Sequence, residues 1–322
     1  MKAIVQDVYG SADVLELRDI DRPVPADDEV LVRVHAAGVD PSVWHLMTGL
    51  PRVSRLAFGL RRPRNPVRGW DGAGRVEQVG AKVTGLKPGD EVFGNCDGSF
   101  AEYARAKADK VVPKPAGLTF EQAAAIPVSA LTALQALRDK GRARAGQKVL
   151  IIGASGGVGS FAVQIALAHD LEVTGVCGPD STDFVRSLGA AHVIDYTSAE
   201  ITDAGRRYDI IVDNAGNRPL SLLRRVLAPR GTLVIVGGEG GGAWLGGIDR
   251  AFRASLLSLF VRQRMGTFYS TARHKDLLTL KDLVEGGKLA PAIDRTYPLT
   301  EAQAAVRHLE SGHPKGKLVL TI

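Results

Sequence analysis

The sequence has few cysteines, few aromatic residues and no long apolar run. Only two cysteines, Cys96 and Cys177, occur among 322 residues, far apart and without a CxxC spacing. A structural zinc lobe of four cysteines is therefore excluded, and a reducing, cytoplasmic setting is expected. No segment approaches the roughly 20 apolar residues of a membrane span. The N-terminus, Met1-Lys-Ala-Ile-Val, has no signal-peptide pattern and predicts a first strand.

Acidic residues are fewer than basic ones, 35 against 41, so the net charge is +6. Arginines gather in a proline-broken stretch at 52–68 and again at 250–264. Such groups suit an anionic ligand, nucleic acid or a membrane surface, or else a solvated loop and an ordinary amphipathic helix. They lack the regular aromatic interleaving that stacking on single strands requires. We favour the solvated alternative, and expect neither a nucleic-acid nor a membrane partner.

The clearest motif is a strand, a glycine turn and a helix between residues 147 and 168. Val149–Ile152 is a short apolar run, typical of a strand covered on both faces. A glycine-rich turn, 153–159, follows, and residues 161–168 carry apolar side chains at helical spacing. Glycine lets the backbone approach a pyrophosphate closely, and the free N–H groups of the helix point at the phosphates. In this context the turn indicates a dinucleotide site rather than a tight turn without a ligand.

The spacing of hydrophobic residues changes along the chain and divides it into two regions. Residues 1–118 hold short strands such as Glu29–His35, which alternates, and predict a mostly antiparallel β-domain whose longest irregular insert is the 51–68 stretch. Thr119 and Gln122 form a capping-box start, and a helix is predicted over Ala123–Leu137, interrupted near Pro127. From Val149 onward strands and helices alternate, which implies a doubly wound parallel sheet. The further strands are expected at 172–177, 192–196, 208–213 and 232–237, and a final strand at 316–322 that is able to return to the first domain.

Several motifs together resemble the medium-chain dehydrogenase/reductase superfamily over essentially the whole chain. Besides the glycine turn, they are Ala36-Ala-Gly-Val-Asp-Pro-Ser, Gly69-Trp-Asp-Gly-Ala-Gly, Leu86-Lys-Pro-Gly-Asp-Glu-Val-Phe-Gly, Ala124-Ala-Ile-Pro-Val-Ser-Ala-Leu-Thr-Ala-Leu and Leu188-Gly-Ala-Ala-His-Val-Ile-Asp-Tyr. The resemblance implies an α/β protein with two domains. A GroES-like substrate domain would span 1–122 and 287–322, and a Rossmann NAD(P)-binding domain 123–286. Hydride transfer would take place in the cleft between them.

The zinc alcohol dehydrogenases of that superfamily bind zinc through a cysteine after the Ala-Gly-Val element and a His-Glu pair after a glycine. Here these positions hold Asp40 and Trp70-Asp71. Carboxylates can ligate a metal, but without a thiolate or an imidazole we expect no zinc. The resemblance therefore points to the zinc-independent, quinone oxidoreductase-like branch, which reduces quinones or the C=C bond of α,β-unsaturated carbonyls. Such conjugated acceptors delocalise the incoming charge and need less help from a Lewis acid.

The expected cofactor is NADPH rather than NADH. NADH enzymes usually carry an acidic residue at the end of the second strand, bonded to the ribose 2′-hydroxyl. Cys177 and Gly178 stand there, although Asp180 follows closely. By similarity to NADPH-using relatives, Ser181 and Tyr196 would contact the 2′-phosphate, with Arg186 nearby.

The remaining cofactor residues follow from the turn and from the resemblance. At the pyrophosphate we expect Gly153, Ser155, Gly156, Gly157, Val158 and Gly159. Thr132 matches a position near the phosphates and ribose, or is a plain helix threonine. Asn214, Gly216, Gly237 and Gly238 follow two strands and would line the nicotinamide ribose. Lys317 either reaches the same cleft or is an exposed strand lysine.

Three residues are candidates for catalysis. Val39-Asp-Pro-Ser-Val-Trp puts Asp40 where relatives place an asparagine near the nicotinamide, so Asp40 would orient the carboxamide or donate a hydrogen bond. Ser42 and His45 match the proton relay of zinc alcohol dehydrogenases. The alternatives are that His45 is a surface histidine beside Trp44, and that bulk water protonates the product.

Two further functions stay open at this point: an alcohol dehydrogenase or ketone reductase with an atypical site, and a nucleic-acid- or membrane-binding relative. Related enzymes are commonly dimers, often through the edge strand of the Rossmann sheet. Residues 265–270 are the candidate edge, because an unpaired strand invites pairing. A homodimer is therefore expected.

Overall fold

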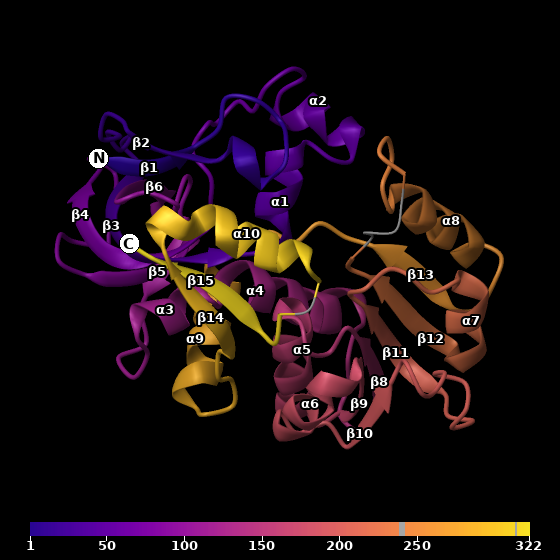
Figure 1. Ribbon diagram of the computed structural model, residues 1–322. Helices are drawn as coiled ribbons and strands as arrows, with labels where there is room; N and C mark the ends of the chain where they lie inside the picture. The colour runs from indigo at the N-terminus through magenta and orange to yellow at the C-terminus, as the bar shows by residue number, and fades with distance from the viewer. Residues whose placement is uncertain (238–241, 313) are drawn as a thin grey trace. The chain divides into compact units, whose positions relative to one another are not determined.

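The computed structural model describes residues 1–237, 242–312 and 314–322, and the chain divides into two compact units (Figure 1). Unit 1 comprises Met1–Leu131, Thr271–Gly287 and Pro291–Ile322. Unit 2 comprises Thr132–Ser270 and Lys288–Ala290. Within the described residues, no helix is both long and apolar enough to cross a membrane.

Unit 1 is built on a seven-stranded sheet in the order β14-β15-β3-β4-β5-β7, with β6 also paired to β3, and on a separate β1–β2 hairpin. Its strands are β1 (Lys2–Val5), β2 (Glu16–Asp19), β3 (Glu29–Val39), β4 (Asp71–Val79), β5 (Glu91–Asn95), β6 (Tyr103–Lys107), β7 (Val111–Pro113), β14 (Ile293–Pro298) and β15 (Lys317–Thr321). Its helices are α1 (Pro41–Thr48), α2 (Arg55–Phe58), α3 (Phe120–Ala124), α9 (His274–Glu285) and α10 (Ala302–Glu310). The C-terminal strand β15 pairs antiparallel with β3, so the predicted return to the first domain is confirmed.

Strand β3 runs to Val39, four residues beyond the predicted His35. The predicted alternation does not hold over its first half, where Val30, Leu31 and Val32 are all buried and Arg33 is exposed. The second half is buried on both faces because α3 packs against it; the His35 ring stacks on Phe120 with centroids 4.3 Å apart. One strand therefore has buried residues on both faces over most of its length.

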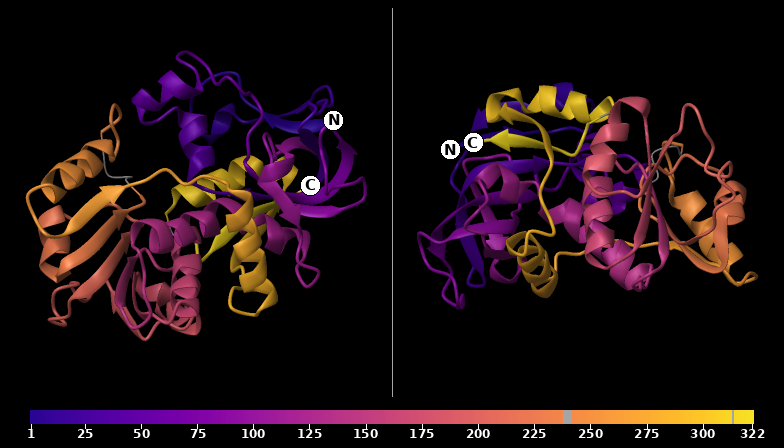
Figure 2. Two further views of the ribbon diagram at one scale, coloured as in Figure 1. Left: turned by 180° about the vertical axis from the view of Figure 1, so that it is seen from behind. Right: turned by 90° about the horizontal axis from the view of Figure 1, so that it is seen from below.

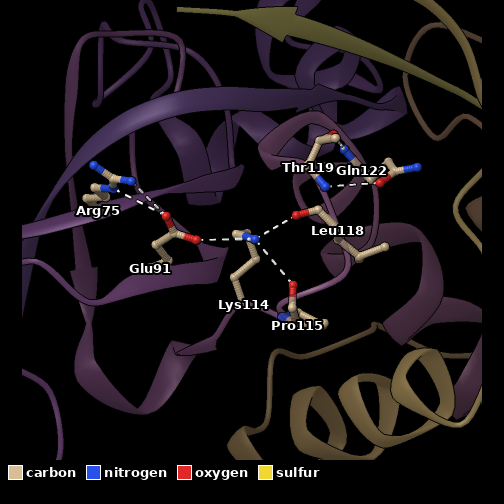
Figure 3. A network of polar contacts seen from close by, with 7 residues as sticks. All are labelled: Arg75, Glu91, Lys114, Pro115, Leu118, Thr119 and Gln122. Carbon is tan, nitrogen blue, oxygen red and sulfur yellow. Dashed lines mark hydrogen bonds and ion pairs between the residues drawn. The ribbon is translucent and has the colours of Figure 1, made fainter.

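The start of α3 is fixed by a polar network (Figure 3). The Thr119 hydroxyl accepts from the Gln122 N–H, and the Gln122 side chain accepts from the Thr119 N–H, so the predicted capping box is confirmed. Just before it, the buried ammonium of Lys114 donates to the Leu118 carbonyl at 2.6 Å and pairs with Glu91 at 3.2 Å. These bonds hold the turn that leads from β7 into α3.

The predicted interruption near Pro127 is confirmed, and the helical region has three segments: α3, α4 (Pro127–Gln135) and a π-helical turn at Ala136–Lys140. The break falls at Pro127, which lacks an N–H and so begins α4 rather than continuing α3. Thr132 is the first residue of unit 2, so α4 runs from one unit into the other.

Unit 2 is a six-stranded parallel sheet in the order β10-β9-β8-β11-β12-β13. Its strands are β8 (Lys148–Ile152), β9 (Glu172–Cys177), β10 (His192–Asp195), β11 (Tyr208–Asp213), β12 (Leu227–Ile235) and β13 (Arg264–Thr267). Its helices are α5 (Gly157–Ala168), α6 (Thr182–Ser187), α7 (Leu220–Val226) and α8 (Ile248–Ser258). Figure 1 shows α5 and α6 on one face of the sheet and α7 and α8 on the other. The predicted doubly wound sheet is confirmed.

The core of unit 2 consists of apolar strand residues that face these helices. Leu150, Ile211 and Leu233 are each at most 1% exposed and lie in one cluster. Burying such a side chain contributes about 1.5–3 kcal/mol. The unbroken apolar runs are buried because helices cover both faces of the sheet.

The boundaries of the units differ from the predicted ones at 122/123 and 286/287. The resemblance places residues 271–286 in the Rossmann domain, but they belong to unit 1. Helix α9 lies against β7, and the Lys110 ammonium donates to the Ala272 carbonyl at 2.6 Å. Tertiary contacts rather than chain order therefore decide where α9 belongs.

Candidate functional site

The glycine turn after β8 has the geometry of an anion cradle. Gly153 has φ +75°, a conformation that favours glycine, and its N–H and that of Ala154 donate to the Val176 carbonyl. Gly156 is the N-cap of α5 and no side chain caps the helix. The first-turn N–H groups of α5 are thus available to a phosphate.

Two glycines of the turn have different functions in the structure. A Cβ at residue 159 would lie 2.0 Å from the Gly153 carbonyl oxygen, so only glycine lets α5 pack this closely on the turn. At Gly156 the nearest atom to an added Cβ is 3.7 Å away, so the space beside it is open. Ser155, Gly157 and Val158 are half-buried in the same turn. The predicted pyrophosphate residues are therefore brought together, and the cradle fits that group.

The end of β9 carries the predicted 2′-phosphate residues. A Cβ at Gly178 would lie 3.2 Å from the Tyr196 hydroxyl, so this half-exposed tyrosine stands beside the strand end. Ser181 lies at the start of α6. The Arg186 guanidinium pairs with Asp183 at 2.8 Å, which partly offsets its charge. No carboxylate lies on β9 beyond Glu172, its first residue.

A third group gathers where β11 and β12 end. The Asn214 amide donates to the Ile152 carbonyl at 3.0 Å, while its Oδ1 is buried and has no partner among the described residues. The Gly216 N–H donates to Asp213 Oδ1, and a Cβ at Gly237 would lie 1.8 Å from the Asn214 carbonyl oxygen. Gly238 lies outside the described residues. Three of the four predicted nicotinamide-ribose residues thus converge at the carboxyl edge of the sheet, where ligands of such sheets bind.

In unit 1 a buried ion pair lies among β4, β15 and α4. The Lys317 ammonium is 3.4 Å from Asp71 Oδ2 and 3.1 Å from the Ser129 hydroxyl. The Val128 N–H donates to the other Asp71 oxygen at 2.9 Å. Both charged side chains are at most 2% exposed, so the alternative of an exposed strand lysine is wrong. Gly38 gives Asp71 its room, since a Cβ there would lie 2.9 Å from the Asp71 Cβ.

Burial raises the pKa of the Asp71 carboxyl to about 7, against the lowering effect of Lys317; the nearby Asp40 carboxylate adds to the rise. Asp40 is itself 1% exposed and is the N-cap of α1. Its Oδ1 accepts from the Ser42 N–H at 2.8 Å and from the Ser42 hydroxyl at 2.5 Å. Its Oδ2 is buried without a partner among the described residues, and is free to accept a hydrogen bond from a ligand.

The two members of the predicted relay have separate partners. Ser42 donates to Asp40, whereas His45 Nδ1 lies 2.8 Å from the Leu50 carbonyl. Because a carbonyl only accepts, Nδ1 of His45 carries a proton and, in the neutral ring, Nε2 is an acceptor. The His45 ring packs edge-on against Trp44 with centroids 5.0 Å apart, and is half-buried rather than fully at the surface.

Two ion pairs at these sites are not predicted by any local sequence pattern. Asp71 and Lys317 are 246 residues apart, and Asp213 pairs with Arg250 at 2.6 Å, 37 residues away. An acidic residue that ends an apolar strand, as Asp213 does, is the signal that was available. From the sequence alone, Asp71 is a candidate only for metal binding. Among the described residues no group of three or more His, Cys, Asp or Glu side chains is placed to hold a metal.

Comparisons with known proteins match both parts of the chain. Residues 26–116 match the family described as alcohol dehydrogenase GroES-like domain, and residues 188–320 the family described as zinc-binding dehydrogenase. The quinone oxidoreductase of Mus musculus is 34% identical over 340 residues, covering 100% of this chain and 98% of that protein. The mitochondrial NAD(P)H oxidoreductase RTN4IP1 of Bos taurus is 32% identical over 368 residues, covering 100% and 89%. The structure of the quinone oxidoreductase from Coxiella burnetii superposes with a TM-score of 0.87 at 29% identity, covering 100% of this chain and 99% of that one.

Proposed function

The chain belongs to the medium-chain dehydrogenase/reductase superfamily as a quinone oxidoreductase-like member, and we propose that it is an NADPH-dependent, zinc-independent reductase of conjugated acceptors. As an oxidoreductase of this superfamily it has two sets of residues to use: the carboxyl edge of the unit 2 sheet, and the Asp40–Asp71–Lys317 group of unit 1. The substrates proposed are quinones and the C=C bond of α,β-unsaturated carbonyls. The observation that carries the proposal is the set of glycine-lined strand ends in unit 2.

Preference for NADPH is supported by the end of β9. Cys177 and Gly178 present no carboxylate to repel a 2′-phosphate, and the Tyr196 hydroxyl lies beside Gly178 to donate to it. Ser181 offers a second hydroxyl at the start of α6. Asp180 is exposed and opposes this preference, so the proposal depends on Tyr196 and Ser181 outweighing it.

Independence from zinc is supported by what surrounds the positions of the zinc ligands. The Asp71 carboxylate already faces the Lys317 ammonium, whose positive charge disfavours a divalent cation there. Asp40 uses one oxygen to bind Ser42. Both are hard oxygen donors, which zinc accepts less readily than thiolate and imidazole.

Bound NADPH supplies a hydride, that is, two electrons and one proton. A quinone that takes up the hydride and one further proton becomes a hydroquinone; an enone becomes a saturated carbonyl, and NADP⁺ is left in either case. Asp40 Oδ2, buried and unpartnered, is suited to accept a hydrogen bond from the nicotinamide carboxamide and so orient the ring. In its imidazolium form His45 delivers the proton from Nε2, which is left as an acceptor while Nδ1 stays bonded to the Leu50 carbonyl; water is the alternative donor.

Two further parts of the proposal concern assembly and setting. Strand β13 is the outer strand of the six-stranded sheet, and its free edge supports a homodimer. The free, buried thiols of Cys96 and Cys177 suit a reducing compartment, and we place the chain in the cytoplasm.

The test is NADPH oxidation, followed at the nicotinamide absorbance, with a panel of quinones, enones, aldehydes and alcohols. Turnover with 1,4-naphthoquinone or an enone, and little with saturated ketones, is expected. Turnover only with alcohols or saturated ketones would instead favour the alcohol dehydrogenase alternative. Salt-sensitive binding of RNA or anionic vesicles without any oxidation would favour the binding-protein alternative.

A further inference from the structure

Unit 2 contains a pocket of about 790 Å³ whose lining includes no residue of the glycine turn 153–159 but shares Gly216 with the predicted nicotinamide-ribose residues. Its walls come from two loops and a helix: the loop after β11, the described part of the loop after β12, and the first turn and a half of α8. These loops leave the same carboxyl edge of the sheet as the glycine turn after β8. The hydride acceptor of a doubly wound sheet is expected at this edge.

Three arginines line this pocket: Arg218, Arg250 and Arg253. One carboxylate, Asp249, is also in the lining, and it pairs with Arg253. A second carboxylate, Asp213, is fully buried and pairs with Arg250 at 2.6 Å. Counting both acids, the group keeps one positive charge in excess.

Several guanidinium donors in this group are unused. Nε and Nη1 of Arg250 and Nε of Arg218 are buried and have no hydrogen-bond partner among the described residues. Among the described residues, Arg250 donates through Nη2 alone, to Asp213 and to the Arg218 carbonyl. A buried charged donor without a partner is costly, and an anionic ligand would satisfy it. In addition, α8 begins at the pocket, and no side chain caps its N-cap Gly247.

Apart from Asn217, the remaining lining residues are apolar or glycine. Leu220, Trp244 and Leu245 contribute large side chains, and glycines at 216, 242, 246 and 247 leave space between them. Such walls bind a flat apolar body, whereas a small hydrated anion would leave them exposed to water. The combination of apolar walls and free guanidinium donors is suited to an organic carboxylate.

We propose that this pocket binds the carboxylate of an acidic acceptor, so that the preferred substrates are quinones or enones that carry a carboxylate group. The inference rests on the proposed reductase function, and it names the class of substrate within it. The carboxylate would pair with Arg218, Arg250 and Arg253. The conjugated part of the molecule would lie toward the nicotinamide end of the sheet edge.

A binding experiment tests the pocket without relying on turnover. The probe is 2-naphthoate, which cannot be reduced, and its neutral isostere is 2-naphthamide; both are titrated by calorimetry. The variants are Arg218→Gln and Arg253→Gln. Arg250 is left intact because its loss would leave the buried Asp213 carboxylate without its ion-pair partner. The matched control is Arg230→Gln, an exposed arginine on β12 outside the pocket.

We expect 2-naphthoate to bind the wild-type chain and the Arg230→Gln control alike, and at least about tenfold more weakly in the other two variants. Weak binding of 2-naphthamide to all four proteins, and no displacement of 2-naphthoate by inorganic phosphate at equal ionic strength, complete the expectation. Equal binding of the acid and the amide would overturn the inference, as would equal loss in the control. Displacement by phosphate would show that the pocket is a general anion site, and this result would also overturn the inference.

Activity then separates the two proposals. The ratio of kcat/KM for carboxylated over unsubstituted 1,4-naphthoquinone should be at least about tenfold in the wild type and fall toward one in Arg253→Gln. Reduction of both quinones without preference would overturn the pocket inference and leave the reductase function standing. Normal binding of 2-naphthoate without reduction of either quinone would instead overturn the reductase function and leave the carboxylate site supported.

Discussion

At the scale of single residues, the unusual feature of unit 1 is a buried ammonium and carboxylate close to a second buried acid. Lys317 and Asp71 are paired at 3.4 Å, and Asp40 is close enough to raise the pKa of Asp71. Removing two charges from water costs several kcal/mol per ion, so loss of one partner leaves a buried unpaired charge that lowers the stability of the fold. Asp40 and Asp71 stand at the positions that the resemblance assigns to zinc ligands in the zinc alcohol dehydrogenases. We interpret the Lys317 ammonium as a positive charge that repels a metal ion from Asp40 and Asp71.

This interpretation predicts a pH-dependent effect of Lys317→Met. The pKa of Asp71 is raised to about 7, so the folded protein holds this proton more tightly than the unfolded chain. That contribution to stability is complete below about pH 4 and is lost as the pH rises through about 7. Lys317 lowers the pKa of Asp71, so its loss raises that pKa further. At about pH 8 the variant holds a buried carboxyl that is either ionised and unpaired or must take up a proton, and the free energy of unfolding should fall by about 3–5 kcal/mol. At about pH 5 Asp71 is protonated and the loss should be smaller.

Urea unfolding at the two pH values measures this difference. The control is the double variant Asp71→Asn/Lys317→Met, which has neither charge and should recover part of the stability that the single variant loses at the higher pH. An equal loss at both pH values, without recovery in the double variant, would show that Lys317 acts by packing alone.

At the scale of elements, the turn after β8 contains one glycine that is needed for packing and another that borders the predicted phosphate site. Alanine at Gly159 would put a Cβ 2.0 Å from a backbone oxygen, whereas alanine at Gly156 meets nothing closer than 3.7 Å. We expect Gly159→Ala to lower both the melting temperature and NADPH affinity. Gly156→Ala should keep the melting temperature within about 2 °C and still weaken NADPH binding at least about tenfold.

Thermal unfolding and cofactor titration by fluorescence check both variants. Gly117→Ala is the control, since this exposed glycine has no atom within 4 Å of an added Cβ and should change neither quantity. Unchanged NADPH affinity in Gly156→Ala would mean that the open space beside that residue is not where the phosphates bind.

The elements also show what the sequence could and could not predict. The strands of unit 2 were predictable because parallel strands are continuous apolar runs; β9 and β11 have the predicted bounds. Strand β12 begins at Leu227 rather than 232, and α9 belongs to unit 1, because both depend on contacts with distant segments. The glycine turn was predictable because it is local. The Asp71–Lys317 and Asp213–Arg250 pairs were not, since no local pattern links residues so far apart.

At the scale of the whole molecule, exposed apolar side chains in and just after α8, near the edge strand β13, bear on how the chain assembles. The views in Figure 2 show α8, in orange, beside β13 at one end of the unit 2 sheet. Phe252, Leu259 and Phe260 are 68%, 77% and 79% exposed, which is costly for large apolar side chains in water. Next to the unpaired edge of β13, they fit the homodimer that we propose.

Light scattering should give a mass of twice the 34.2 kDa of one chain. The variant Leu259→Glu/Phe260→Glu should shift the protein toward monomer at about micromolar concentration, because two charges per chain would be buried in the interface. Leu60→Glu, at a 67% exposed leucine of unit 1, is the control and should leave the mass unchanged. An unchanged dimer in the Leu259→Glu/Phe260→Glu variant would place the interface elsewhere.

The central claim is that hydride passes from NADPH to a conjugated acceptor without a metal. Its most direct test is kcat/KM for NADPH and for NADH with 1,4-naphthoquinone, measured on enzyme freed of metal by a chelator. We expect a preference for NADPH of at least about tenfold, equal to roughly 1.4 kcal/mol, and the same rates before and after chelation. A preference for NADH would contradict the assignment of Tyr196 and Ser181 to the 2′-phosphate. Activity lost on chelation and restored by zinc would contradict the account of Asp40, Asp71 and Lys317.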